Sequence, residues 1–465
     1  MEVWLFYGIM FAGAMIAAIT IVLSITLGLQ VRVKWQNYTL PILIALLGIN
    51  MALSPILNGR DLRLMYTGVD FLPTGYQSAL AAYVAKLFSY LAILAAFVEV
   101  AHHFVKSKRT IGGQERTLIT ALVLYFAAAF ALPGLLGERR GLEHFHFYPP
   151  LIFSALYLSC GNEPERVAKI FRNTIAGVLL ASLAVAAVHP DMVLQFNFRG
   201  AIPLFDFRFW GLAAHPNAFA PLALTFLILL KSTPYKRQTL NIAAWAIGVG
   251  AVLTAQSKTV WLIALTLLAA NHVLRIVSEL GKRSASAVSV GVVGGSALLV
   301  IGFLAVMIAW SLGLTTINLK FMNEIDTKSL STLTGRDLIW ELTLKEWRNS
   351  PAFGYGLNLW GEEYRRLQAM PSAFHAHNQF VQTLGSGGVV GLTGLIGYLC
   401  VLFWGSTRVV ASFRPIAFTL ILMLMIRSFS EPPFEMKSIG DANMMMHLCL
   451  FALIVSSIRT GRKSQ

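Results

Sequence analysis

Thirteen apolar stretches constrain the fold of this chain more than any other feature. Each is long enough, or nearly so, to cross a bilayer, which takes about 20 residues. They cover residues 4–29, 39–57, 78–101, 117–136, 147–160, 173–188, 214–230, 239–256, 258–277, 287–312, 378–404, 413–428 and 441–458. Backbone groups in a bilayer must bond internally, so such spans fold as helices. The sequence predicts an all-α polytopic membrane protein with about 12–13 transmembrane helices, forming one membrane domain over residues 1–465.

Composition excludes several other classes of protein. Of the 465 residues, 56% are hydrophobic and only 13% are charged, whereas a soluble chain has about 25% charged residues. A large soluble enzyme and a nucleic-acid-binding protein are therefore excluded, despite the net charge of +15. The three cysteines lie within or at the ends of apolar spans, so we expect no disulfide and no metal–thiolate site. The N-terminus has no positive segment and no cleavage site, so the first span should be retained.

The positive charges predict the orientation of the chain. Alternate short connections hold twenty of the 37 Lys and Arg residues, and such loops stay in the cytoplasm. These cations are Arg32, Lys34, Lys106, Lys108, Arg109, Arg116, Arg166, Lys169, Arg172, Lys231, Lys236, Arg237, Arg275, Lys282, Arg283, Arg408, Arg414, Arg459, Arg462 and Lys463. With thirteen spans, the N-terminus lies outside and the C-terminus on the cytoplasmic side of the membrane. The net positive charge then faces anionic lipid.

The only long connection, residues 313–377, is predicted to be a loop on the outer side of the membrane, which is the periplasmic side if the chain is a bacterial inner-membrane protein. Residues 336–349 within it have the periodicity of an amphipathic helix. We expect Leu338, Trp340 and Trp347 near one face, with the helix lying in the plane of the outer interface.

Four polar segments lie at the predicted outer ends of spans. They are Arg208 with His215-Pro216-Asn217, Gln256-Ser257-Lys258-Thr259, Thr334-Gly335-Arg336-Asp337 and His375-Ala376-His377-Asn378. Taken singly, each is explained by ordinary helix capping or by side chains that extend to the interface. Together they bring cations and helix N-termini to one membrane face. A cation in a first helical turn opposes the helix dipole, and a bound anion reconciles the two. The segments therefore predict a binding site for a highly charged anion such as a diphosphate.

Histidine side chains complete this predicted site. Imidazoles titrate near neutral pH, which suits a general base. We expect His377, next to Asn378 at the start of span 378–404, to be the base and to be oriented by Asn378. A metal bound by His375 and His377 is the alternative, as is a purely structural role. No third ligand with suitable spacing is evident, so we predict no metal.

In order and spacing, these segments resemble the O-antigen ligase and repeat-unit polymerase superfamily of bacterial inner membranes. The resemblance covers about residues 200–435, a predicted catalytic region. Its motifs also include Trp261, Ser350-Pro351, Gly354-Tyr355-Gly356, Gly388 and Gly391, and it ends at Arg427 and Glu431.

The resemblance implies a C-type membrane glycosyltransferase that works at the periplasmic face without cofactor or metal. Its donor is a glycan on undecaprenyl diphosphate. His377 matches the family's base, Arg336 matches a cation on the leaving diphosphate, and Arg208 matches a second phosphate contact. Lys258 is a further diphosphate contact, at a position where ligases usually carry Arg. Supporting roles fall to His215, Asn217, His375, Asn378, Arg427 and Glu431.

Three functions remain open, with different partners. A repeat-unit polymerase transfers glycan to another lipid-linked glycan, and the Ser-Lys-Thr-x-Trp sequence at Lys258 favours it. An O-antigen ligase transfers glycan to lipid A-core. A flippase of lipid-linked oligosaccharides is the alternative outside enzymes, but flippases tend to show internal repeats and charges at mid-membrane. No repeat is evident, and Lys86 and Glu99 can extend to the interface. Membrane lipid, a flippase and a chain-length regulator are the other expected partners, and nucleic acid is not one.

Overall fold

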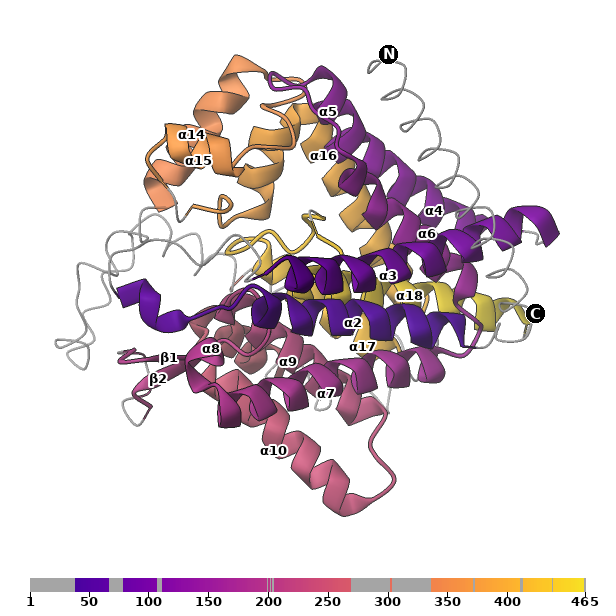
Figure 1. The fold of residues 1–465 in the computed structure, drawn as a ribbon. Helices are drawn as coiled ribbons and strands as arrows, with labels where there is room; N and C mark the ends of the chain where they lie inside the picture. Colours follow the sequence, from indigo (N-terminus) through magenta and orange to yellow (C-terminus); the bar gives the residue numbers. More distant parts are fainter. Residues whose placement is uncertain are drawn as a thin grey trace, which may run out of the picture.

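The computed structural model describes residues 38–66, 78–106, 111–198, 200, 202, 205–268, 302, 336–370, 373–409, 413–436 and 438–463. Within these ranges, six helices are long and apolar enough to cross a membrane. They are α2 (Thr39–Leu57), α3 (Ala79–Lys106), Gly113–Leu136, α7 (Pro164–Val188), α16 (Gln379–Thr407) and α18 (Ala442–Lys463). Three shorter apolar helices are α9 (Pro216–Ser232), α10 (Gln238–Thr254) and Lys258–Leu268. An all-α polytopic membrane protein is thus confirmed (Figure 1).

The remaining elements are short. They are η1 (Leu62–Tyr66), η3 (His144–Phe147), α6 (Tyr148–Ser159), α8 (Pro190–Val193), α14 (Arg336–Asn349), α15 (Glu362–Leu367) and α17 (Arg414–Arg427). Gly113–Leu136 itself consists of α4 (Gly113–Phe126), a π-helical turn η2 (Ala127–Ala131) and α5 (Leu132–Leu136). The π turn lies just before Pro133, which cannot donate a helical hydrogen bond.

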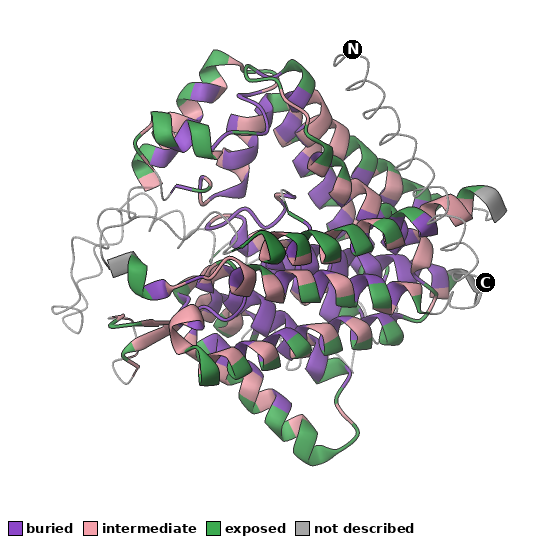
Figure 2. Ribbon diagram, in the orientation of Figure 1, coloured by how far each residue is buried: buried purple, intermediate pink, exposed green. Residues whose placement is uncertain are grey.

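Helix α18 forms the centre of the bundle. Its apolar window is 89% buried, and it packs against α6, α7, α9 and α17. A helix that is apolar all round must be surrounded by other helices, and the sequence from Met444 to Val455 has this character. Figure 2 shows α18 as an almost continuous buried element, with exposed residues on the outer faces of α3 and α10.

The predicted spans match these helices closely, with one clear difference. Helix α7 begins at Pro164, nine residues before the predicted start at residue 173. Arg166, Lys169 and Arg172, predicted to lie in a loop, therefore belong to the helix. Pro164 favours a helix start, and Lys169 pairs with Glu165 one turn earlier. The spans at 4–29 and 287–312 lie outside the described residues, apart from Gly302.

Two charges on α3 behave differently from each other. Lys86 is exposed, as expected for a side chain that extends to the interface. Glu99 is 1% exposed, so the expectation that it extends to the interface is wrong. A buried carboxylate must be compensated by other groups of the protein.

A small β-hairpin was not predicted. Strands β1 (Leu194–Phe196) and β2 (Phe207–Phe209) pair antiparallel, with Gln195 opposite Arg208. Both strands alternate apolar and polar residues, which is the strand pattern, but three residues are too few to stand out from loops. This hairpin carries Arg208 to the start of α9.

Helix α16 is kinked at Gly388, and the loop of residues 350–356 packs against this kink. Gly388 has φ +62°, and a Cβ there would collide with the carbonyl of Ala352. The loop's carbonyls at Pro351 and Ala352 accept the N–H groups of Val389 and Val390 at 2.9 and 3.1 Å. In return, the N–H groups of Tyr355 and Gly356 bond Gly385 and Ser386 of α16. The Ser350–Gly356 motif and the helix glycines are therefore two halves of one backbone contact.

Helices α14 and α15 form a cap at one end of α16 (Figure 1). Helix α14 begins at Arg336 and ends at Asn349, as predicted, whereas Thr334 and Gly335 lie outside the described residues. The expected apolar face is confirmed only in part: Trp340 packs against the buried cluster of the cap, but Leu338 does not. The buried residues are Ile339, Thr343 and Glu346, and Leu338 is 49% exposed. The buried face has the helical spacing i, i+4, i+7 and includes two polar residues. Inside the cap, Thr343 accepts a hydrogen bond from Trp360, and Glu346 accepts one from Tyr364.

Candidate active site

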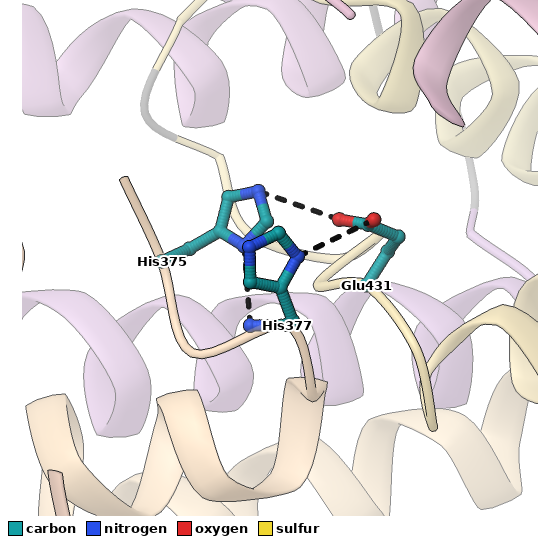
Figure 3. A group of neighbouring side chains, drawn as sticks. All are labelled: His375, His377 and Glu431. Carbon is teal, nitrogen blue, oxygen red and sulfur yellow. Dashed lines mark hydrogen bonds and ion pairs between the residues drawn. The ribbon is translucent and has the colours of Figure 1, made fainter. Parts of the chain in front are cut away.

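Three side chains converge at the start of α16. Nε2 of His375 lies 3.3 Å from Oε2 of Glu431, and Nδ1 of His377 lies 3.5 Å from Oε1 of the same carboxylate. The two imidazole rings are 4.3 Å apart between centroids. Figure 3 shows both rings directed at the carboxylate. Glu431 is buried, and the two histidines are partly accessible.

The helix start fixes the two histidines. Asn378 caps α16, and its side-chain oxygen accepts the N–H groups of Phe380 and Val381 at 2.9 and 3.1 Å. Asn378 therefore caps the helix rather than contacting the His377 ring, contrary to expectation. His377 has φ +49°, a left-handed conformation that is uncommon for residues other than Gly. This turn folds its N–H back onto Nδ1 of His375 at 3.2 Å.

Glu431 reaches the histidines through backbone contacts of its own loop. This loop follows α17, and its Ser428 carbonyl accepts the N–H of Gln379 at 2.7 Å. The side-chain oxygen of Gln379 accepts the N–H of Phe434 at 2.8 Å. These two bonds hold the loop on both sides of Glu431 against the first residue of α16. The carboxylate is thus positioned by a rigid helix start.

Asn217, at the start of α9, connects Glu431 to the cations. Its amide N–H₂ donates to Oε1 of Glu431 at 2.9 Å. Its amide oxygen accepts from Arg208 at 3.0 Å and from the Ser257 hydroxyl at 3.2 Å. Its backbone carbonyl accepts from Arg427 at 2.9 Å. The starts of α9 and of helix Lys258–Leu268 therefore meet through the Asn217 amide, and Glu431 connects this amide to the histidines at the start of α16. The sequence predicts such a meeting for three helix N-termini on one face.

His215 serves as the cap of α9. Its Nδ1 accepts the N–H of Asn217 at 3.1 Å, and its ring packs against Trp210. Burial, and next the charge of Arg208, lower the pKa of His215 to about 3. His215 is therefore neutral at working pH and adds no positive charge to the site.

The charges of the site do not balance. Arg208, Arg336 and Arg427 are all close enough to Glu431 for its charge to favour their ionised forms. Burial lowers the pKa of Arg208 to about 10 and shifts that of Arg336 downward, yet both remain charged near neutral pH. Burial also opposes ionisation of Glu431. The contact with His377, and the positive charges that the neighbouring histidines carry when they are protonated, outweigh it and hold the pKa of Glu431 well below 4.5. Asp441 also lies close to Arg427. Even with the histidines neutral, Arg208, Arg336 and Arg427 therefore outnumber Glu431 and Asp441 among the described residues, which leaves an excess of positive charge.

The protons of His375 can be assigned from its bonds. Nδ1 accepts the N–H of His377, so the neutral ring carries its proton on Nε2 and donates it to Glu431. His377 differs, because its Nδ1 is buried with no hydrogen-bond partner by strict geometry among the described residues. The nearest acceptor for a proton there is Glu431 at 3.5 Å. That arrangement leaves Nε2 of His377 with a free lone pair.

A metal must also be considered at these residues. His375, His377 and Glu431 each offer one ligand atom, and these atoms lie within 4.8 Å of one another. The absence of a third ligand, which we inferred from sequence spacing, is therefore wrong, because Glu431 comes from a distant part of the chain. A histidine that binds a metal through Nε2 donates a proton from Nδ1 to a neighbour. Nδ1 of His375 accepts a hydrogen bond instead, so this geometry suits a carboxylate–imidazole pair better than a metal.

The structure gathers most of the predicted site residues but not all. Lys258 is exposed and takes no part in the hydrogen bonds and ion pairs recorded among the described residues. Its neighbour Ser257 makes the contact to Asn217 instead. The residues in contact around Glu431 and Asn217 are Arg208, His215, Ser257, His375, His377 and Arg427. Gln379, which fixes the Glu431 loop, was not predicted, and its only signal was its place beside the His-Asn pair.

Comparisons with known proteins agree with these motifs. The family model described as O-antigen ligase matches residues 242–396. This range contains the starts of helix Lys258–Leu268, α14 and α16, and both halves of the Gly388 contact. No curated protein matches the chain. The family match supports the resemblance seen in the motifs: residues 242–396 of this membrane protein are similar to the O-antigen ligase family.

Proposed function

We propose that this protein transfers a glycan from undecaprenyl diphosphate to an acceptor hydroxyl at the periplasmic face of the bacterial inner membrane. Among the reactions of its family, we propose repeat-unit polymerisation, in which the acceptor is another lipid-linked glycan. Transfer to lipid A-core is the alternative. The reaction needs no cofactor, no metal and no nucleotide sugar.

One observation carries the proposal. His377, whose Nε2 takes part in no hydrogen bond recorded among the described residues, lies in contact with Glu431 beside two partly buried arginines, Arg208 and Arg336, whose charge exceeds that of the carboxylate. Excess positive charge in a buried site is unfavourable without an anion. A diphosphate supplies that anion, and it is also a leaving group that gains charge as its bond to the sugar breaks.

The chemistry follows from this arrangement. Nε2 of His377 takes the proton of the acceptor hydroxyl while Glu431 stabilises the resulting imidazolium through Nδ1. The acceptor oxygen attacks the anomeric carbon of the donor sugar. The bond between that carbon and the diphosphate oxygen breaks, and its electron pair leaves with the diphosphate. Arg208 and Arg336 stabilise the charge that develops there.

Other residues of the site hold these groups in place. Arg427 is buried and bonded to Asn217 and Asn443, so it positions the Asn217 amide rather than touching the donor. His375 donates to the second oxygen of Glu431 and thereby orients the carboxylate. Lys258 stands where ligases usually carry Arg. A lysine lacks the bidentate fork of a guanidinium, and this difference favours a polymerase over a ligase.

The experiment uses the purified full-length protein in lipid nanodiscs with a synthetic undecaprenyl-diphosphate glycan. Polymerisation predicts a ladder of longer lipid-linked glycans with the donor alone, and His377→Ala and Arg336→Ala should abolish it. A product formed only when lipid A-core is added supports the ligase alternative. Movement of intact donor between leaflets, with no new glycosidic bond, would contradict enzymatic transfer altogether.

A further inference from the structure

A large apolar groove lies away from the histidine site. Helices α9, α10 and Lys258–Leu268 and the first turns of α17 enclose a cavity of about 530 Å³. Most of its lining is aliphatic or aromatic, including Leu227, Trp245, Val249 and Trp261. Cavities of this size hold ligands of several hundred cubic ångströms. In a membrane protein, an apolar groove between helices accommodates a hydrocarbon chain.

Among the described residues that line this groove, the one charged side chain lies at one end. Lys231 and Ser232 are the last residues of α9, and they line the groove together with Pro415 at the start of α17. Thr419 and Trp261 also line the groove, and their polar atoms bond backbone carbonyls of their own neighbourhood. The groove is therefore amphipathic along its length, with a cation at one end and hydrocarbon elsewhere.

The polar end attracts an anion more strongly than a lone lysine would. Lys236 and Arg237 follow Lys231 in the exposed connection to α10, and Arg414 precedes Pro415. Helix α17 also begins here, and its N-cap residue Phe413 provides no side-chain cap. The positive end of the α17 dipole thus adds to the charge of the lysine. Charge and shape both match a lipid with an anionic headgroup.

We propose that this α9–α10 groove binds one acyl chain of an anionic phospholipid, whose headgroup contacts Lys231. The chain lies along Leu227, Val249 and Trp261, and the phosphate accepts from Lys231 and Ser232. A polyprenyl chain of a bound donor fits less well. Its diphosphate belongs at the opposite end of α9, near Asn217, and it would leave the cation at Lys231 unmatched.

The test uses delipidated full-length protein in a mild detergent and measures phospholipid binding by native mass spectrometry. The probes are 1-palmitoyl-2-oleoyl phosphatidylglycerol and the zwitterionic phosphatidylcholine with the same chains. One lysine beside an anionic headgroup predicts an affinity for phosphatidylglycerol about fivefold higher than for phosphatidylcholine. Lys231→Ala should remove most of that preference, because Lys231 is the cation that lines the groove. Lys236→Ala, a more distant cation, should retain most of it.

A second pair of variants tests the groove itself. Val249→Trp fills it and should weaken binding of both lipids by at least about tenfold, because the chain loses its place. Leu240→Trp, on the opposite side of α10 and 50% exposed, should bind like the wild type. Equal affinity for the two lipids, or unchanged binding to Val249→Trp, overturns the proposal. Displacement of phosphatidylglycerol by undecaprenyl phosphate at equal concentration also overturns it.

Lys231 is exposed, so its variant remains informative if Val249→Trp fails to fold. Glycosyl transfer is not the readout, so the outcome is independent of the proposed function.

Discussion

Oε1 of Glu431 lies 3.5 Å from Nδ1 of His377, although the two residues come from the ends of different helices. The contact is maintained by the bond between the Gln379 N–H and the Ser428 carbonyl. A carboxylate in this place orients the imidazole and stabilises its charged form. We therefore expect substitutions of His375 and His377 to have different effects on turnover.

His377→Ala should reduce turnover by about 10²–10⁴-fold, the usual contribution of a general base. His375→Ala should reduce it by about tenfold, because it removes one hydrogen bond to Glu431 and leaves the base in place. Turnover of the purified variants with synthetic donor, measured against pH, distinguishes the two. Equal losses for both variants, or wild-type turnover in His377→Ala, would contradict the assignment of the base.

Glu431→Gln should destabilise the protein at neutral pH, and the effect should shrink in acid. The pKa of Glu431 lies well below its ordinary value of 4.5. A carboxylate with a lowered pKa stabilises the fold above its unfolded pKa, and this contribution disappears as pH falls through the folded pKa. Removing the partner of a buried cation costs about 3 kcal/mol. Unfolding in detergent at pH 7 and pH 4 measures the difference from wild type. A difference that grows on acidification would show that the sign is wrong.

The helices were largely predictable because membrane spans depend on local apolarity. The sequence placed the start of α14 at Arg336 and that of α16 beside Asn378, where capping residues are visible in the chain. The start of α7 was misplaced, because charged residues that extend a helix beyond the apolar span look like a loop. The β-hairpin that carries Arg208 escaped notice because three-residue strands leave almost no periodic signal.

The site was predictable in its members but not in its contacts. Arg208, Asn217 and His377 stand at helix starts or near them, so their convergence follows from topology. The pairing of Glu431 with both histidines depends on how a loop after α17 folds onto Gln379, which no local pattern encodes. The same limitation explains why Lys258 was predicted as a site residue. It stands at a helix start in the sequence, but its side chain is exposed in the structure.

Arg336→Ala should lower kcat/KM by about 10²–10³-fold, the cost of removing one fixed group that stabilises developing charge. Lys258→Ala should lower it by less than about tenfold, because an exposed cation is screened by water. Lys345→Ala, an exposed cation on the same helix as Arg336, is the control and should behave like wild type. Inhibition by inorganic diphosphate should weaken in parallel with the loss at Arg336. Near-normal transfer by Arg336→Ala would remove the basis for a diphosphate site.

The loop at 313–377 should face the periplasm, and the chain after Arg459 should face the cytoplasm. This orientation follows from the excess of Lys and Arg in alternate connections. Alkaline phosphatase fused after residue 340 should be active, and green fluorescent protein fused at the C-terminus should fluoresce. The reciprocal fusions serve as controls. A fluorescent fusion after residue 340 would place the histidines on the wrong side for a periplasmic reaction.

Removal of divalent metals should leave transfer unchanged. His375, His377 and Glu431 are close enough to hold an ion, but Nδ1 of His375 accepts a hydrogen bond and so cannot carry the proton that a metal-bound ring requires. Turnover with EDTA should equal turnover without it, and elemental analysis of the purified protein should find no stoichiometric zinc.

The variant His375→Gln further distinguishes the carboxylate–imidazole pair from a metal site. A glutamine can still donate to Glu431 but is a poor metal ligand, so transfer should largely survive in the carboxylate–imidazole arrangement. Loss of activity with EDTA that zinc restores, together with loss of bound zinc in His375→Gln, would replace the base with a metal site.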